Sequence, residues 1–424
     1  METNRVLSEQ TSENIYHCIK CGLCLAHCPA YKEILLEEAS PRGKVQISKF
    51  IAEGDLSLSE EVKETLFSTC LLCGSCVVNC PSGVHGAHLI SGLRWRAVQK
   101  YGVDWRKKVL FQILSSGWMM SGSAWFARWA RKGFGDFKFQ AGALPLEKIP
   151  RMNDKPFSTT VSEVVESPGE AKARVLYFHG CATNYLYGGI GKAVVDVLPK
   201  MGVEVRIPKD QICCGLPIFL SGDRASSLNC IRKTLEIFNG KEADAIIVDC
   251  ATCGAALKNE YPYLLQELRD LGEKVSEKEI AAAKDMAAKV KDVTVFIDEH
   301  KEWLPPLRKR ESNLRVAYHD PCHLVKGQKV SAQPRNLLSS IPGVEYVEMA
   351  SADACCGGGG AFQVEHAETS RKITKRKIDS INAVKVDAVA TCCPGCNLTI
   401  SAHLNGERPM EVLHPVQLLQ RSLA

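Results

Sequence analysis

Apolar residues in positions 1–100 recur three or four apart, the spacing of helices that bury one face. Segments 41–52 and 59–67 both follow this pattern, and Ser59 occupies the position of a helix cap. We therefore predict helices, and not β-hairpins, as the connections within this part of the chain.

The next segment, residues 101–172, contains nineteen consecutive uncharged residues, 109–127, between basic flanks. A membrane span needs about 20 strongly apolar residues, whereas this run includes four serines, two glycines and a glutamine. We predict a helical pair buried against the protein or a partner. The alternative is an interfacial membrane contact, favoured by Trp118, Trp125 and Trp129. Four prolines then predict that residues 134–173 form a linker without regular structure.

From Arg174 onward, buried strand-like runs alternate with helical sequence, and the whole pattern occurs twice with a period of about 141 residues. A period of this length indicates a duplicated domain and not a solenoid. Strands alternating with helices predict α/β units with parallel sheets. Cysteines follow these strands, at the carboxyl ends where such sheets bind ligands.

The predicted fold class is therefore α+β multidomain, in agreement with a length of 424 residues, which suits about three domains. We place a helical domain at 1–100, a helical segment and linker at 101–172, and the two α/β units at 173–305 and 306–424.

Composition matters chiefly through its 20 cysteines. Disulfide scaffolds belong to short secreted chains, and residues 1–14 have no apolar signal core. We therefore expect a cytoplasmic protein whose thiolates bind metal. The net charge of +5 is spread along the chain, so no nucleic-acid partner is expected.

Two cysteine runs, each ending in Cys-Pro, have the spacing that holds a [4Fe-4S] cluster. They comprise Cys18, Cys21, Cys24 and Cys28, then Cys70, Cys73, Cys76 and Cys80. In two-cluster ferredoxins the fourth cysteine ligates the other cluster. We accordingly group Cys80 with the first three cysteines of the first run, and Cys28 with the first three of the second. A zinc site would not use the third Cys-x2 step.

Each repeated unit contains a single cysteine, a Cys-Cys-Gly and a Cys-x2-Cys. Five thiolates with an adjacent pair suggest a group larger than one metal ion, with zinc in one unit as the alternative. In the second unit, Cys392 and Cys393 are both candidates for the start of the last motif.

This arrangement resembles the cysteine-rich (CCG) domains of heterodisulfide reductase subunits. Fused behind a two-cluster helical ferredoxin domain, it is similar to the iron-sulfur subunits of glycolate oxidase and of lactate and anaerobic glycerol 3-phosphate dehydrogenases. The resemblance covers Cys18 to about Pro415 and includes Pro41-Arg42-Gly43. It implies one or two further, noncubane [4Fe-4S] clusters, with ligands Cys181, Cys213, Cys214, Cys250, Cys253, Cys322, Cys355, Cys356, Cys393 and Cys396.

Other residues receive plainer interpretations. His179, His319 and His323 flank these cysteines and are expected to support them through hydrogen bonds. Gly357–Gly360 lacks the pattern of a phosphate loop and is expected to let the backbone approach a cluster. Cys230 lies in helical sequence and is expected to be a small buried hydrophobe.

The resemblance implies an electron-transfer subunit without a flavin motif of its own. A partner subunit carrying FAD would oxidise glycolate or D-lactate and pass electrons through this chain to quinone or an electron-transferring flavoprotein, with peripheral contact at the inner face of the cell membrane. The alternative is reduction of a disulfide or quinone at a CCG site of this chain. Neither the hydroxy acid, the acceptor, the potentials nor the stoichiometry follows from the sequence, and catalytic residues are unassigned.

Overall fold

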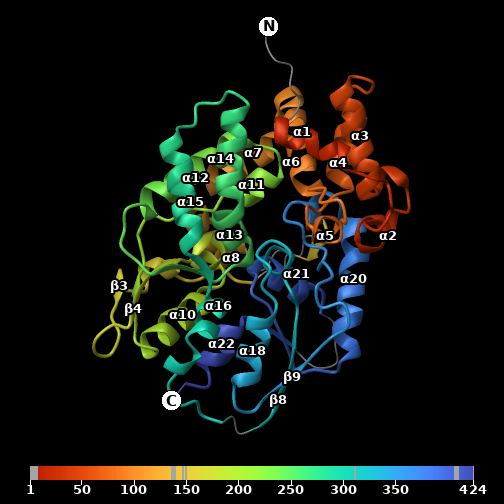
Figure 1. The fold of residues 1–424 in the computed structure, drawn as a ribbon. Coiled ribbons are helices and arrows are strands. Elements are labelled where there is room, and N and C mark those ends of the chain that lie inside the picture. The colour runs from red at the N-terminus through yellow and green to blue at the C-terminus, as the bar shows by residue number, and fades with distance from the viewer. Residues whose placement is uncertain are drawn as a thin grey trace.

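The computed structural model describes residues 8–134, 140–145, 148, 150–309, 312–404 and 410–423. Its N-terminal part is helical, as predicted, and lies beside the first α/β unit and above the second in Figure 1. Its elements are α1 (Glu9–Tyr16), η1 (Leu25–His27), α2 (Tyr31–Ile34), η2 (Glu37–Ala39), α3 (Pro41–Glu53), α4 (Glu60–Ser68), α5 (Ser75–Val78) and α6 (Gly86–Tyr101).

Caps determine where the two predicted helices of this part begin. Ser59 caps α4 by accepting a hydrogen bond from Val62 N. Ser40 caps α3 by accepting one from Gly43 N, and Pro41 follows at the first helical position, where its missing N–H costs nothing. These two features determine where α3 begins.

Two further helices, α7 (Trp105–Leu114) and α8 (Gly117–Phe134), cover the uncharged run. Phe111, Met120 and Ala124 pack against the first α/β unit. The prediction that these helices pack against the protein is therefore confirmed for one face. Four tryptophans, Trp105, Trp118, Trp125 and Trp129, lie exposed on the two helices, and burial of these side chains against a partner stays a prediction. Among the described residues, none of the helices combines the length and the apolar character that crossing a membrane requires.

The first α/β unit is built on a sheet in the order β3-β5-β4-β6-β7. Its four main strands are parallel, and β3 pairs antiparallel with β5. The expectation of a linker without regular structure is thus wrong in part. Pairing with a sheet edge orders the two residues of β3, and the same segment contains a short antiparallel pair, Gln140–Ala141 with Leu144–Pro145, and a 3-10 turn, Phe157–Thr159. The strands are β3 (Val164–Val165), β4 (Ala173–Phe178), β5 (Val203–Arg206), β6 (Ala245–Val248) and β7 (Val290–Asp292).

The remaining elements before and around this sheet are mostly helical. They are the antiparallel pair β1 (Gln140–Ala141) and β2 (Leu144–Pro145), then η4 (Phe157–Thr159), α9 (Gly180–Tyr185), α10 (Gly188–Lys200), α11 (Leu216–Leu220), α12 (Arg224–Phe238), α13 (Ala251–Ala255), the π-helical turn η5 (Ala256–Glu260), α14 (Tyr261–Asp270), α15 (Glu277–Lys289), α16 (Val293–Glu299) and η6 (Lys301–Trp303).

The second unit repeats this topology with a parallel sheet in the order β9-β8-β10-β11, which matches β5-β4-β6-β7. Its elements are β8 (Leu314–Tyr318), α17 (Cys322–Val325), α18 (Ala332–Ser340), β9 (Val344–Val347), α19 (Phe362–Glu365), α20 (Ala367–Ala383), β10 (Ala388–Ala390), α21 (Pro394–His403), β11 (Glu411–Leu413) and α22 (Pro415–Gln420). One hydrophobic core extends through both units.

The duplication extends to single hydrogen bonds. Arg174 N donates to Asp244 Oδ2 at 2.8 Å, and in the second unit Arg315 N donates to Asp387 Oδ2 at 2.9 Å. The predicted duplicated parallel sheets are therefore present, and they place the cysteines after β4, β6, β8 and β10 at the carboxyl ends.

Candidate metal centres

Two cysteine-lined cavities lie in the N-terminal part, and each collects its thiols from both cysteine runs. The first is lined by Cys18, Cys21 and Cys24 together with Cys80. The second is lined by Cys70, Cys73 and Cys76 together with Cys28. The structure therefore brings together the two crossed sets expected from the sequence. We call them the first and the second cubane set, and the cavities that they line the first and the second cubane cavity.

Both cysteine loops have the same unusual backbone. Gly22 and Gly74 have φ values of 82° and 72°. Lys20 and Leu72, at equivalent positions of the two runs, have φ values of 59° and 54°. Non-glycine residues rarely adopt this left-handed conformation, and functional sites are where it concentrates. The sequence indicated the role of the two glycines but not of Lys20 and Leu72.

The start of α3 lies between these cavities, because Pro41 and Val45 line both. Lys44 lines the second cavity and is almost completely buried. Burial raises the pKa of Cys28 to about 11, and the nearby charge of Lys44 opposes this shift. Since iron binding requires the thiolate, Lys44 favours the ligating form of Cys28.

Arg94, on α6, fixes the second cysteine loop through hydrogen bonds to backbone carbonyls. Its buried guanidinium donates to the carbonyls of Leu66, Phe67 and Cys70, and to Leu220 O of the first α/β unit at 2.9 Å. It therefore ties this loop to a neighbouring unit. Sequence reasoning missed it, although an arginine within an apolar helix face was the available signal.

A third cavity, of about 250 Å³, lies where the three parts of the molecule meet. All ten cysteines that the resemblance implied as CCG ligands line it: Cys181, Cys213, Cys214, Cys250, Cys253, Cys322, Cys355, Cys356, Cys393 and Cys396. Cys70 and Cys73 of the second cubane set reach its wall as well. The two repeated units thus share one cavity, which the sequence did not indicate.

The adjacent thiols behave alike in the two units. In the first, hydrogen bonds from Cys213 and Cys253 lower the pKa of Cys214 to about 5. In the second, hydrogen bonds from Cys355 and Cys396 hold the pKa of Cys356 well below its usual range, and its Sγ lies 3.6 Å from Cys396 Sγ. The second thiol of each pair is therefore the one most readily available as a thiolate.

His319 adds a nitrogen donor to the second unit. Its ring lies with Cys356 and Cys396 in a group whose possible ligand atoms are all within 4.8 Å of one another. Within the described part of the chain, both ring nitrogens are buried without a hydrogen-bond partner, and burial lowers the pKa of His319. Buried polar atoms are normally satisfied, so this cradle of thiols and an orphaned imidazole fits a bound metal group.

The structure separates Cys392 from Cys393. Cys393 lines the shared cavity, whereas Cys392 is fully buried and accepts a hydrogen bond from Tyr318 OH at 3.3 Å. In the first unit Asp249 occupies the position of Cys392 and accepts from Tyr177 OH at 2.6 Å. Cys392 therefore takes the place of Asp249, which binds a tyrosine hydroxyl of its own unit and does not line the cavity. This equivalence favours Cys393 as the ligand.

The other residues singled out in the sequence are two histidines, a glycine and Cys230, and only Cys230 lies away from the shared cavity. His179 and His323 line it, and His323 Nδ1 is 3.2 Å from Thr252 Oγ1. Gly358 also lines it, and an added Cβ there would lie 2.6 Å from Thr399 Oγ1, so this position needs a glycine. Cys230 is buried among apolar residues outside the cavity.

Neighbouring cysteine-lined cavities share some of their lining cysteines, so the three cavities lie next to one another in a row. Cys76 lines both cubane cavities, and Cys70 and Cys73 line both the second cubane cavity and the shared one. Lys326 of the second unit donates to Ser75 Oγ at 2.7 Å, which fixes that unit to the second loop. Between the two α/β units, Thr252 Oγ1 lies 3.5 Å from Cys393 Sγ.

Comparison with known proteins defines the class first. Residues 14–84 match the 4Fe-4S dicluster domain, and residues 175–258 and 316–401 match the cysteine-rich domain CCG. This is an iron-sulfur protein with one dicluster domain and two cysteine-rich domains.

Its similarity to known relatives extends along nearly the whole chain. It is 31% identical to the probable glycolate oxidase iron-sulfur subunit of Bacillus subtilis, over 93% of this chain and 90% of that protein. It is 26% identical to one of the subunits of the dihydromethanophenazine:CoB–CoM heterodisulfide reductase of Methanosarcina mazei, over 93% and 90% of the two chains. The chain belongs to the glycolate oxidase iron-sulfur subunit family.

A solved structure supports the fold alone. A hypothetical protein from Helicobacter pylori superposes with a TM-score of 0.50 at 10% identity, covering 89% of this chain and 66% of that one.

Proposed function

We propose that this chain is the electron-relay subunit of a flavin-dependent 2-hydroxy acid dehydrogenase, accepting electrons from a partner subunit that carries FAD and oxidises glycolate or D-lactate. The acceptor would be quinone or an electron-transferring flavoprotein. Bound [4Fe-4S] clusters would supply one-electron transfer, with two cubanes in the N-terminal part and further noncubane clusters in the CCG units.

The observation that carries the proposal is the unbroken succession of cysteine sets. Adjacent cavities share lining residues from the surface loop of Cys21 to the buried cysteines of the α/β units. A site that catalyses a single reaction would need only one set of cysteines. Electron transfer across a protein needs several cluster sites that adjoin one another.

Entry at the first cubane set is supported by the surface around it. Ile19 and Leu23 lie on the loop of this set, and both are more than half exposed. Leu35 and Leu36 are similarly exposed at the end of α2. Exposed apolar side chains beside a cluster loop suit docking of a protein partner.

The test is reduction of the anaerobically purified, iron-loaded chain. Alone, it should not oxidise glycolate or D-lactate, but with the FAD subunit and substrate its clusters should be reduced, as seen by electron paramagnetic resonance. Hydroxy-acid oxidation by the chain alone would overturn the proposal, as would a metal content that is chiefly zinc.

A second candidate is catalysis by this chain, with a disulfide or quinone reduced at a CCG site. It is favoured by the shared cavity of about 250 Å³, which adjoins both adjacent-thiol pairs, and by the name of the Methanosarcina relative. Turnover of a small disulfide by the chain with a chemical reductant would support this candidate against the relay.

A further inference from the structure

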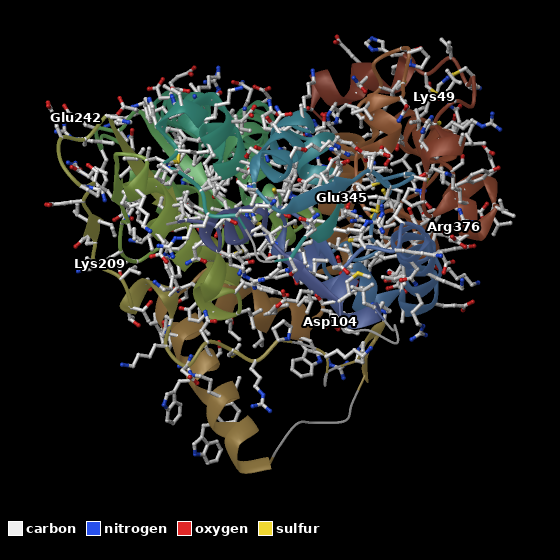
Figure 2. The ribbon with its side chains drawn as sticks, turned by 90° about the horizontal axis from the view of Figure 1, so that it is seen from below. Lys49, Asp104, Lys209, Glu242, Glu345 and Arg376 are labelled. Carbon is white, nitrogen blue, oxygen red and sulfur yellow. The ribbon has the colours of Figure 1, made fainter. Side chains whose placement is uncertain are left out.

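A fourth cavity, of about 400 Å³, lies between the N-terminal part and the second α/β unit. Its walls come from α2 and the second cysteine loop on one side and from α20 on the other. α20 lies against α2 (Figure 1), and Figure 2 shows Arg376 of α20 where the two parts meet. We call it the basic cavity, and its charged lining residues are Lys32, Glu33, Lys326, Asp353, Arg376 and Lys377.

The lining of the basic cavity carries more positive than negative charge. With His27 counted as neutral, its described residues include three lysines, one arginine, one aspartate and one glutamate, an excess of two positive charges. Both carboxylates already have a cationic partner, because Glu33 Oε1 lies 2.8 Å from Arg376 Nε and Asp353 Oδ2 lies 3.7 Å from Lys326 Nζ. In the part of the chain that the structure describes, the two remaining cations have no carboxylate within 4 Å.

One of these two cations, Lys377, is almost completely buried. Its side chain is 2% exposed, and its Nζ donates to Ser351 O at 2.7 Å and to Ala352 O at 3.1 Å. An ammonium group has three N–H donors, so these two bonds leave one for a ligand. Burial lowers the pKa of Lys377 to about 8, which keeps most of it charged at neutral pH. Lysines are almost never fully buried unless an anion pairs with them.

Two kinds of counterion suit Lys377. The first is the thiolates of Cys355 and Cys356, whose charge raises its pKa, although burial has the larger effect. They act through charge alone, because the hydrogen bonds of Lys377 to the described residues go to carbonyl groups. The second is an anion in the basic cavity, which Lys377 lines and can reach with its third donor. The two counterions are compatible, and only the second explains the volume beside this ammonium.

We propose that the basic cavity binds a small organic dianion, a dicarboxylate or a phosphate monoester, with one oxyanion group on Lys377 and the other near Lys32. Two negative charges match the excess of two positive charges in the lining. A volume of about 400 Å³ lies within the range of pockets that hold small organic molecules. Charge-assisted hydrogen bonds from an ammonium to an oxyanion are among the strong ones in proteins.

The bound dianion would lie beside the second CCG unit. Among the cysteines, all of which the structure describes, only Cys355 lines the basic cavity, and it also lines the shared one. Negative charge next to a cluster disfavours its reduced state, so the dianion should lower the reduction potential of the second-unit cluster. Potentiometric titration with and without the dianion measures this effect, which rests on the proposed relay, whereas the binding itself does not.

The experiment is isothermal titration calorimetry of the iron-loaded full chain with succinate, ethyl phosphate and the neutral succinamide. We expect one saturable site for at least one of the two dianions and none for succinamide, and the tighter dianion identifies the preferred oxyanion group. K377M keeps the apolar stem and removes the buried charge, so it should weaken binding tenfold or more. K32Q removes an exposed, more strongly screened charge and should weaken binding a few-fold.

A third variant controls for charge on the same helix. Lys372 of α20 is exposed, lies 2.8 Å from Glu368 and does not line the basic cavity, so K372Q should bind like the unaltered chain. Iron content and thermal unfolding show which variants fold, and K32Q carries the test if K377M does not. Failure of both dianions to bind would overturn the inference, as would equal affinity in K377M, K32Q and the unaltered chain. Reduction of the clusters by the FAD subunit is measured separately, so either outcome leaves the proposed relay intact.

Discussion

At the scale of single residues, the fourth cysteine of each run belongs to the cavity of the other run. Replacing Cys28 with serine should therefore change the same cluster signal as replacing Cys73. Replacing Cys80 should change the same signal as replacing Cys21. Electron paramagnetic resonance of the four single variants, with iron analysis, checks both pairings. Matching spectra for Cys28→Ser and Cys21→Ser would show instead that each run holds its own cluster.

Lys44 is a buried positive charge at the wall of the second cubane cavity. A nearby cation favours the reduced, more negative state of a cluster. Lys44→Met keeps the side-chain stem and removes the charge, so the reduction potential of this cluster should fall by on the order of tens of millivolts. Potentiometric titration followed by paramagnetic resonance measures the shift.

Lys49 provides the control on the same helix. Its ammonium is partly exposed and lies 3.8 Å from Glu53, so Lys49→Met should leave the potential almost unchanged. Equal shifts in the two variants would mean that Lys44 does not act through its burial.

At the scale of elements, Pro41-Arg42-Gly43 acquires a structural explanation. A Cβ added at Gly43 would lie 1.9 Å from Glu37 O, so only glycine lets α3 begin against the turn before it. Because the start of α3 separates the cubane cavities, Gly43→Ala should lower the iron content of both cubanes and the thermal stability of the N-terminal part. At Gly122, on α8, an added Cβ would have no atom of the described residues within 4 Å, so Gly122→Ala should leave iron binding unchanged.

Local pattern was sufficient for most elements. Apolar spacing and Ser59 predicted α3 and α4, and buried runs predicted β4, β6, β8 and β10 with their cysteines at the carboxyl ends. β3 was not predictable, because its two residues are ordered by pairing with β5, a contact set by the sheet and not by local propensity.

The sequence predicted the cysteines of the site but not the charged side chains that act on them. Cysteine spacing pointed to the thiols, but Arg94 and Lys44 act on the cysteine loops through contacts that only the packing of α3 and α6 creates. The apolar character of residues 109–127 predicted burial, but it could not show what would cover Trp118, Trp125 and Trp129, which lie exposed on α8.

At the scale of the whole molecule, the shared cavity places the second unit beside the second cubane set. Cys356→Ser should therefore abolish transfer to the acceptor while both cubanes remain reducible by the FAD subunit. Cys214→Ser should do the same if electrons leave through the first unit. Cys230→Ala removes a buried thiol outside the cavity and serves as control. Normal turnover in a Cys356→Ser chain lacking the metal of its second unit would remove that site from the electron path.

The burial of the ten cysteines bears on how the protein is made. Eight of them are almost inaccessible, and Cys181 and Cys322 are only partly exposed. The walls of the cavity come from both units, and those units share one continuous core. Iron and sulfide delivered to the finished fold would have to separate that core. We therefore expect iron and sulfide to be inserted while the second unit, synthesised after the first, is still closing over it, which makes the supply of cofactor during synthesis a determinant of how much protein reaches its active form.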